Sequence, residues 1–350
     1  MKHVPLLRMT SAGPYCEVGG FHVDPCQPVA RAVITHAHAD HITKGSRSYL
    51  TAKPGVELLR SRLSPNAIIQ PLEYGVGLDI AGTRVSLHPA GHILGSAQVR
   101  MEHRGEVWVI TGDYKTTPDP TCAAFEPVPC QTLITESTFG NPIFRWPDSA
   151  VVMDSIHHWW RRNQAAGVAS LLYAYALGKA QRLLYALDPQ IGPIAVHRDI
   201  TTNCEFYQVE GVTFPTTFDP HRLDNAKHWP RGLYVISPSS RWRQPFPFHG
   251  NYATAFVSGW MLLPDGAEKR RVETGFALSD HADHAEIRAT IAATGAERVG
   301  VMHGYIDPLV AELQAAGLEA FSFRSPRCGQ PPVVAHSASG PLSPVRGGEG

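Results

Sequence analysis

The sequence has no excess charge of one sign and no long apolar run. Its 350 residues carry 31 basic and 31 acidic side chains, so the formal net charge is zero. Nucleic-acid binding through overall basicity is thereby excluded, and any site for a polyanion must be local. No stretch reaches the roughly 18 uninterrupted apolar residues of a membrane span, and the first residues lack the apolar core of a signal peptide. We therefore expect a cytoplasmic protein with no membrane partner.

Cysteine is also scarce, and its spacing is uninformative. The six cysteines are scattered and include no C-x-x-C pair, so neither a disulfide framework nor a thiolate zinc cluster is indicated. We expect reduced, mostly buried thiols. Hydrophobic residues make up 43% of the chain, which is enough for one large core or two smaller ones in a globular α/β protein.

The apolar patterns change along the chain. Short β-branched runs bounded by Gly, Pro or Asp predict strands over residues 19–137. From about 150 to 190 the spacing is helical, with LLYAYALGK between two helical stretches predicted to be a buried strand that leads into a helix. Short strands return over 191–263. The last patterned part is a helix at 281–294, a strand at 297–304 and a helix at 307–317.

One short stretch concentrates side chains that bind metals. Residues 36–41 read HAHADH and follow the apolar run AVIT. If the strand continues, His36 and His38 project the same way and can chelate one ion. Asp40 and His41 lie past the strand end, where they can face a second ion. A solvated polar turn is the alternative, so this stretch is not decisive alone.

Three further candidates lie at later strand ends or in the turns that follow them. His92 lies in PAGHILGS, Asp113 in VITGDY and His303 in VGVMHG, each beside a glycine that permits a tight turn. Imidazole and carboxylate without thiolate suit zinc or manganese, and two-metal sites serve hydrolysis. A dinuclear hydrolytic site is therefore plausible, with Zn²⁺ as the first choice and Mn²⁺ as the second.

This ordered set resembles the metallo-β-lactamase fold hydrolases, whose pattern is H-x-H-x-D-H followed by His, Asp and His. The resemblance implies an α/β fold, a four-layer αββα sandwich, with two divalent metal ions. It implies one assignment of ligands: His36, His38 and His92 hold the first metal, Asp40, His41 and His303 hold the second, and Asp113 bridges the two.

Additional motifs resemble those of the beta-CASP nucleases, one branch of this fold. TESTFGNP contains Glu136 and LSDHADH contains His281, and roughly 130 residues between them match the length of an inserted α/β domain. ALGKAQ and VISPSSR are similar to elements of that insert. The implied domains are a metallo-β-lactamase part at 1–148, the beta-CASP insert at 149–272, a return segment at 273–325 and a disordered tail at 326–350.

The same resemblance assigns roles in phosphodiester cleavage. His281 would protonate the departing 3′ oxygen, and Glu136 would orient that imidazole and keep it protonated. Asp40 is also predicted to be a catalytic residue, because it would hold the second metal. The turn around His281 contains three more candidate partners of the site: Asp280, Asp283 and His284. His284 is also an alternative metal ligand.

Contacts to nucleic acid are predicted in the insert. Lys179 and Gln181 begin a helix, where free N–H groups attract anions, although both could simply be capping residues. A hydroxyl-rich turn and a mixed Arg and aromatic stretch supply the remaining candidates: Ser237, Ser239, Ser240, Arg241 and Arg243. The basic run at 268–271 is expected to be a solvated turn.

The substrate stays open between DNA and RNA. VSGWMLLP and GFALSDHADH look most like bacterial ligase-associated DNA exonucleases, which implies a 5′ to 3′ single-strand exonuclease in DNA repair, linked to ATP-dependent DNA ligase and helicase. His303 in the last motif points instead to an RNA-processing beta-CASP ribonuclease. A thioesterase or lactonase of this fold would lack the Glu136 and His281 pair, and a degenerate binding subunit would lack metal ligands. We favour DNA.

Overall fold

The computed structural model describes residues 5–220, 229–239 and 251–324. The chain divides into two compact units: the first comprises residues 1–118, 123–142 and 282–350, and the second comprises 119–122 and 143–281. The limits of the predicted beta-CASP insert, residues 149 and 272, remain a prediction. The predicted disordered tail lies outside the described residues.

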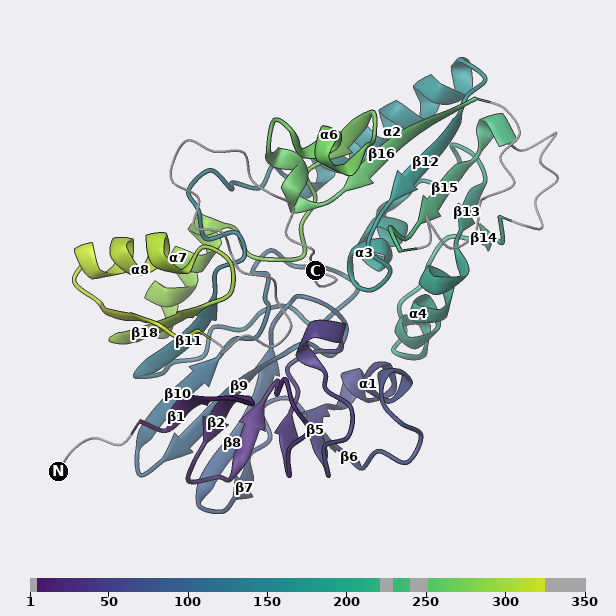
Figure 1. Ribbon diagram of the computed structural model, residues 1–350. Coiled ribbons are helices and arrows are strands. Elements are labelled where there is room, and N and C mark those ends of the chain that lie inside the picture. Colours follow the sequence, from purple (N-terminus) through teal and green to yellow (C-terminus); the bar gives the residue numbers. More distant parts are fainter. Residues whose placement is uncertain (1–4, 221–228, 240–250, 325–350) are drawn as a thin grey trace. The chain divides into compact units, whose positions relative to one another are not determined.

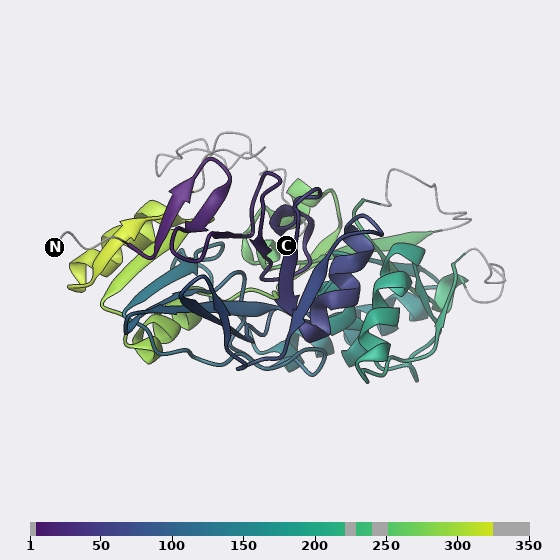
Figure 2. The ribbon, with the colours of Figure 1, turned by 90° about the horizontal axis from the view of Figure 1, so that it is seen from below.

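Two sheets form the frame of the first unit. The first sheet has the order β1 (Leu7–Thr10), β2 (Gly13–Cys16), β3 (Phe21–Val23), β4 (Ala32–Val33), β5 (Tyr49–Ala52) and β6 (Ile69–Leu72). The second has the order β19 (Glu319–Ser322), β18 (Arg298–Met302), β11 (Thr132–Glu136), β10 (Glu106–Ile110), β9 (Ala97–His103), β8 (Thr83–Pro89) and β7 (Leu78–Ile80). Figure 2 shows the purple strands of the first sheet and the blue strands of the second as separate layers.

Side chains from both sheets meet in one shared core. Phe21 and Leu50 of the first sheet pack with Val99, Trp108 and Ile134 of the second, and all five are buried. Burying apolar surface on facing sides of two sheets is the main source of stability in such an arrangement. The inner faces of the two sheets are thus held against one another.

Helices cover the outer faces of these sheets. The helices α7 (His284–Thr294) and α8 (Ile306–Ala315) bury Ile287 and Leu309 against the second sheet, next to β18 and β11 (Figure 1). The helix α1 (Val56–Arg62) buries Leu59 and packs with Tyr49 of the first sheet. The unit is therefore a mixed α/β structure with its strands inside.

Five strands of the second sheet run in the same direction. β10, β11, β18 and β19 pair in parallel, and β8 has the direction of β10 because both are antiparallel to β9. Their carboxyl ends therefore lie at one edge of the sheet. Candidate residues follow these ends: His92 after β8, Asp113 after β10, Glu136 at the end of β11 and His303 after β18.

The strand before HAHADH is shorter than predicted. β4 ends at Val33, and His36 and His38 lie in an irregular segment followed by a 3₁₀ turn at Ala39–His41. The backbone N–H of Thr35 donates to the side chain of Asp24 at 2.8 Å instead of continuing the ladder. The strand therefore does not continue through the two histidines, although both follow its carboxyl end.

The second unit contains a six-stranded parallel sheet. Its order is β14 (Thr217–Phe218), β13 (Ile194–Val196), β15 (Leu233–Ile236), β12 (Ala169–Tyr173), β16 (Tyr252–Val257) and β17 (Thr274–Phe276). The α-helices in the described residues of this unit are α2 (Ser149–Ala165), α3 (Lys179–Ala186), α4 (Arg198–Val209) and α6 (Gly266–Arg270). Side chains of α2, α3 and α4 pack in one core with one face of the sheet.

Two helix predictions need correction. The helix α4 lies in the range predicted to hold only short strands, although Ile200, Cys204 and Tyr207 are buried at helical spacing. The helix predicted from His281 begins at His284 instead. Asp283 caps it, accepting from the backbone N–H of Glu286 at 2.9 Å, so the three preceding residues are left outside the helix.

The cysteines only partly follow expectation. Cys16, Cys130 and Cys204 are buried free thiols, and Cys122 is a half-buried one. Cys26 is disulfide-bonded, so the expectation of reduced thiols is wrong at that position. Burial raises the pKa of Cys204 to about 11, which keeps this thiol protonated at neutral pH.

The described residues contain no helix that could span a membrane. None of the helices within 5–220, 229–239 and 251–324 combines the length and the apolar character needed to cross a bilayer.

Gly95 is expected to be essential for the turn after His92. Its φ is +73°, and a Cβ there would lie 2.2 Å from the Cα of Gly55. We expect Gly95→Ala to lower the free energy of unfolding by about 3 kcal/mol or more, because backbone must move. Gly105→Ala is the matched control: φ is +82° but no described atom lies within 4 Å, so a cost of about 1 kcal/mol is expected. Denaturant unfolding that gave both variants the same cost would contradict the role of this contact.

Candidate metal centre

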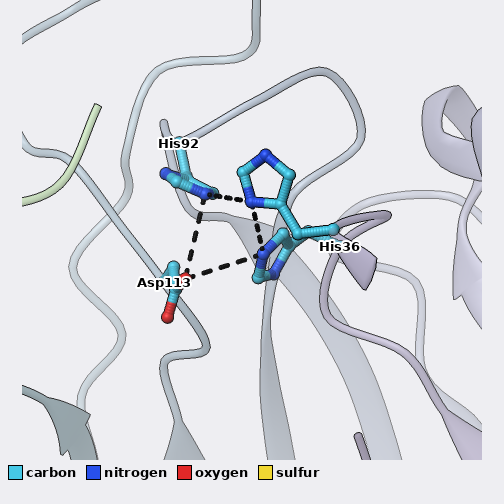
Figure 3. A group of neighbouring side chains, drawn as sticks. His36, His92 and Asp113 are labelled. Atoms are coloured by element: carbon cyan, nitrogen blue, oxygen red, sulfur yellow. Dashed lines mark hydrogen bonds and ion pairs between the residues drawn. The ribbon is translucent and has the colours of Figure 1, made fainter. Parts of the chain in front are cut away.

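Three imidazoles and one carboxylate of the first unit converge beyond the ends of its strands β4, β8 and β10. Nδ1 of His38 lies 3.1 Å from Nε2 of His36 and 3.1 Å from Nε2 of His92. Oδ2 of Asp113 lies 3.7 Å from Nε2 of His36 and 3.9 Å from Nε2 of His92. Figure 3 shows His36, His92 and Asp113 pointing toward one another. The four donor atoms lie within 4.8 Å of each other, and all four residues are buried.

These donors fit a divalent ion. Zn–N bonds of 2.0–2.1 Å in a tetrahedral site place the ligand nitrogens roughly 3.3 Å apart, close to the observed 3.1 Å. Burial and the neighbouring imidazole of His41 lower the pKa of His36 well below its ordinary value. Its ring is therefore neutral, as a metal ligand must be. The group contains no thiolate, which is consistent with zinc or manganese.

Asp24 controls two of the histidines. Oδ2 of Asp24 accepts from the Thr35 hydroxyl at 2.5 Å and from Nδ1 of His41 at 2.8 Å. Since the Thr35 hydroxyl gives its single proton to Asp24, it must accept from Nδ1 of His36, which lies 3.0 Å away. Both histidines therefore carry a proton on Nδ1, and Nε2 is the ring atom that faces the centre.

Asp24 has no role in the sequence prediction. It is 12 residues before His36, and only the parallel pairing of β3 with β4, with Val23 opposite Val33, brings it next to Thr35. Its φ of +42° is a conformation in which Asp is enriched among non-glycine residues. The Asp-Pro pair at the strand end is the one sequence signal that could have pointed to it.

The donors predicted for a second ion surround His41. Nε2 of His41 lies 3.5 Å from Oδ2 of Asp113 and 3.8 Å from Oδ2 of Asp40, and its ring centroid is 5.7 Å from that of His303. Burial lowers the pKa of His41, but the carboxylates of Asp113, Asp40 and Asp24 outweigh it and raise that pKa well above the ordinary value. Positive charge is therefore favoured at this point.

The residues predicted to hold the second ion are less closely grouped than those predicted to hold the first. Among the residues that the structure describes, the compact donor groups do not include Asp40, His41 or His303. Asp40 is exposed and His303 is half-buried. His303 has a φ of +58°, which is strained for a non-glycine residue, and Ser137 donates its hydroxyl proton to the His303 carbonyl.

Glu136 is buried beside this edge. Its Oε1 accepts the backbone N–H of Tyr114 at 2.8 Å, so it contacts the residue that follows Asp113. The turn between β10 and Asp113 depends on Gly112, whose φ is +58° and whose Cβ, if present, would lie 2.7 Å from the Thr35 side chain. A glycine therefore lets the Asp113 turn approach the segment that leads to His36.

His281 and its neighbour Asp280 are buried in the second unit. The His281 carbonyl accepts from Nε1 of Trp146 at 2.9 Å, and its N–H donates to Oγ of Ser279 at 3.1 Å. Oδ1 of Asp280 lies 2.8 Å from Nζ of Lys179 and 4.0 Å from Nε2 of His281. A buried ion pair thus lies next to the imidazole predicted to be the acid.

The predicted nucleic-acid contacts divide into buried, accessible and undescribed residues. Lys179 and Gln181 are buried; the Gln181 amide caps the N–H of Gly178 at 2.7 Å and donates to Ala176 O at 3.1 Å. Ser237 is buried and lies 3.0 Å, oxygen to oxygen, from the exposed Ser239. The remaining predicted contacts lie outside the described residues: Ser240, Arg241 and Arg243.

Contacts in the structure bear on two other predictions, those for His284 and for the basic run at 268–271. His284, the alternative ligand, has Nε2 2.7 Å from Oε2 of Glu312. The basic run at 268–271 is not simply solvated, because Arg270 packs over the Phe256 ring at 4.9 Å and donates to the Tyr175 hydroxyl at 3.0 Å. The expectation of a solvated turn is wrong for Arg270.

Comparison with solved structures concerns the fold. A crystal structure of a protein of unknown function from Enterococcus faecalis V583 matches this chain with a TM-score of 0.52 at 14% identity. The match covers 77% of this chain and 74% of that one. At this identity the likeness shows a shared fold and nothing about activity.

Curated proteins give a more specific result. No protein-family model matches the chain. A "Probable DNA ligase" of Opitutus terrae is 32% identical over 320 residues, covering 89% of this chain and 30% of that protein. "Endoribonuclease YSH1" of Gibberella zeae is 31% identical over 158 residues, covering 44% of this chain and 18% of that protein. "Transcription termination factor FttA" of Methanocaldococcus jannaschii is 27% identical over 216 residues, covering 51% and 33%.

The ordered donor set and these relatives point to one class. The similarity is consistent with the resemblance of the sequence to the beta-CASP branch of the metallo-β-lactamase fold proteins. Among its relatives are the protein named as a DNA ligase, the YSH1 endoribonuclease and FttA. The chain spans about a third or less of the length of each of these three relatives.

Asp24 gives a test of the centre that does not need a substrate. We expect Asp24→Asn to weaken Zn²⁺ binding about 10- to 100-fold, because His36 and His41 lose the carboxylate that fixes their protons on Nδ1. Competition with a chromophoric chelator measures the affinity, and the exposed Glu17→Gln variant is the matched control. Unchanged Zn²⁺ affinity in folded Asp24→Asn protein would rule out this role.

Proposed function

We propose that the protein is a metal-dependent phosphodiesterase that degrades DNA, as a 5′ to 3′ exonuclease of single strands in DNA repair. The observation that carries this proposal is the buried convergence of His36, His38, His92 and Asp113 at one strand edge, beside the buried carboxylate of Glu136. A hydrolytic centre needs such a donor set, and phosphodiesters are substrates that divalent ions activate.

The proposed centre takes two divalent ions, with Zn²⁺ preferred and Mn²⁺ as the alternative. His36, His38 and His92 would hold the first, Asp40, His41 and His303 the second, and Asp113 both. When bound, such ions neutralise the charge of the phosphate and lower the pKa of water. The arrangement of the chain within the metallo-β-lactamase αββα sandwich, with a beta-CASP insert, is part of the same proposal.

The protein's own side chains would handle the proton of the leaving group. Hydroxide, formed when water releases a proton to solvent, would form the new bond to phosphorus; the bond from phosphorus to the 3′ oxygen would break, and His281 would give its proton to that oxygen. Glu136 would favour the protonated imidazole, since a nearby carboxylate stabilises the charged form. Asp280, next to His281 and paired with Lys179 at 2.8 Å, adds a fixed negative charge beside the ring.

The preference for DNA is supported by the Opitutus relative. A protein named as a DNA ligase contains, in 30% of its length, a region similar to 89% of this chain. A shared chain supports a shared substrate and a functional link to a DNA ligase. A link to an ATP-dependent ligase and a helicase is proposed from the sequence resemblance alone. In the second unit, Ser239 and the other predicted contacts after β15 would bind the phosphate backbone.

An RNA-processing ribonuclease is the second candidate. Two observations favour it: the last predicted ligand is His303, and the curated relatives include endoribonucleases that cover 44% and 37% of this chain. A thioesterase or lactonase of the same fold is supported less, because it would leave the buried Glu136 and the inserted unit without a role.

The substrate can be tested directly. Matched single-stranded DNA and RNA, each labelled at the 5′ or the 3′ end, are incubated with the protein and Zn²⁺ or Mn²⁺. We expect the DNA to be degraded from its 5′ end, and Asp40→Ala to reduce the rate by orders of magnitude. Asp79→Ala, an exposed aspartate in β7, is the control. Faster cleavage of RNA would replace DNA in the proposal, and an active Asp40→Ala protein would contradict the second metal.

His281 should affect chemistry without affecting metal content. We expect His281→Ala to bind Zn²⁺ like the parent protein while DNA cleavage falls roughly 10²- to 10⁴-fold, because the departing oxygen loses its acid. His158→Ala, an exposed histidine of the same unit, is the control. Metal analysis together with the cleavage rate decides, and a parental rate in His281→Ala protein would remove the acid role.

A further inference from the structure

The carboxylate of Glu286, in the first turn of α7, receives an unusual number of donors. Its Oε1 accepts from the hydroxyls of Thr116 and Thr117, both at 2.7 Å, and from the Thr117 N–H at 3.1 Å. Its Oε2 accepts the N–H of Asp283 at 2.9 Å. Nζ of Lys115 lies 3.1 and 3.0 Å from the two oxygens. All of these residues belong to the first unit.

Helix capping explains only part of this set. Glu286 and Asp283 form a capping box, which requires the contact of Oε2 with the Asp283 N–H and nothing more. The contacts with residues 115–117 come from a segment about 170 positions away in the chain, directly after Asp113. Burial would raise the pKa of Glu286, but Lys115 and the threonine hydroxyls outweigh it and lower that pKa to about 2. The carboxylate is therefore charged at neutral pH.

These contacts close a ring with the backbone of Tyr114. The N–H of Ala282 donates to the carbonyl of Tyr114 at 2.6 Å, and the N–H of Tyr114 donates to Oε1 of Glu136 at 2.8 Å. The peptide groups of Tyr114 thus lie between Glu136 and Ala282. Ala282 directly follows His281 in the chain, so the ring holds the backbone next to both members of the proposed acid pair.

We propose that Glu286 is a positioning residue for proton transfer to the leaving group. By holding residues 115–117 against the start of α7, it fixes the Tyr114 peptide between Glu136 and Ala282. The inference rests on the proposed function, because it assumes that His281 gives its proton to the departing 3′ oxygen. Glu286 itself contacts neither the substrate nor the donors of the metal centre in this account.

The test compares two leaving groups in Glu286→Gln protein. A DNA 3′ oxygen needs a proton to depart, whereas p-nitrophenolate from bis(p-nitrophenyl) phosphate departs without one. We expect kcat on single-stranded DNA to fall about tenfold or more, with KM within about twofold of the parent. Hydrolysis of bis(p-nitrophenyl) phosphate and the affinity for Zn²⁺ should stay within about twofold. Glu297→Gln, an exposed carboxylate of the same unit, is the matched control.

A milder variant guards against misfolding. Thr117→Val removes one hydroxyl donor but keeps the N–H, and we expect the same selective loss on DNA at a smaller, about threefold, size. An equal loss with both substrates, a loss of Zn²⁺ affinity, or no loss in either variant would overturn the proposal. Two other results would instead overturn the proposed function on which this inference rests: no DNA cleavage by the parent protein, or the same cleavage rate in the parent and in the His281→Ala variant.

Discussion

The alignment of four strands determines everything else at the centre. β8, β10, β11 and β18 run in the same direction, so the turns that follow them open on one edge of one sheet. Side chains separated by up to 211 positions, His92 and His303, are thereby brought to the same edge. Without this common direction the donors would be shared between opposite edges, and no ion could contact them together.

A second constraint is electrostatic. The edge collects imidazole nitrogens and buried carboxylates in a volume where water is largely excluded, and separated charges are costly there. Asp24 resolves part of the conflict, because it accepts a hydrogen bond from Nδ1 of His41 directly and orients Nδ1 of His36 through the Thr35 hydroxyl. The Nε2 atoms of both rings then face the Asp113 carboxylate. A cation bound among these groups would offset the cost of collecting them in a buried place.

The sequence predicted the donors better than the elements that hold them. His36 and His38 could be chosen because HAHADH concentrates ligand-type residues, and His92 and Asp113 because each follows a predicted strand beside a glycine; the structure gathers all four. Asp24 could not be chosen, because its role depends on the register of β3 with β4. The helix α4 was missed because its buried face includes Asn203 and Cys204, which weaken an apolar pattern. The start of α7 was placed too early because Asp283 and Glu286 were not recognised as a capping box.

The order of segments along the chain has a consequence for how the protein is made. All four donors of the compact group lie before residue 119, whereas β18, β19 and His303 follow the second unit. During synthesis the first donors leave the ribosome well before the strands that complete their sheet, since the second unit must be translated in between. A nascent chain thus exposes the four donors of the compact group early, but it acquires His281 and His303 only after nearly all of the second unit has been made. A product truncated before residue 281 would carry the proposed first metal site without the groups proposed to use it.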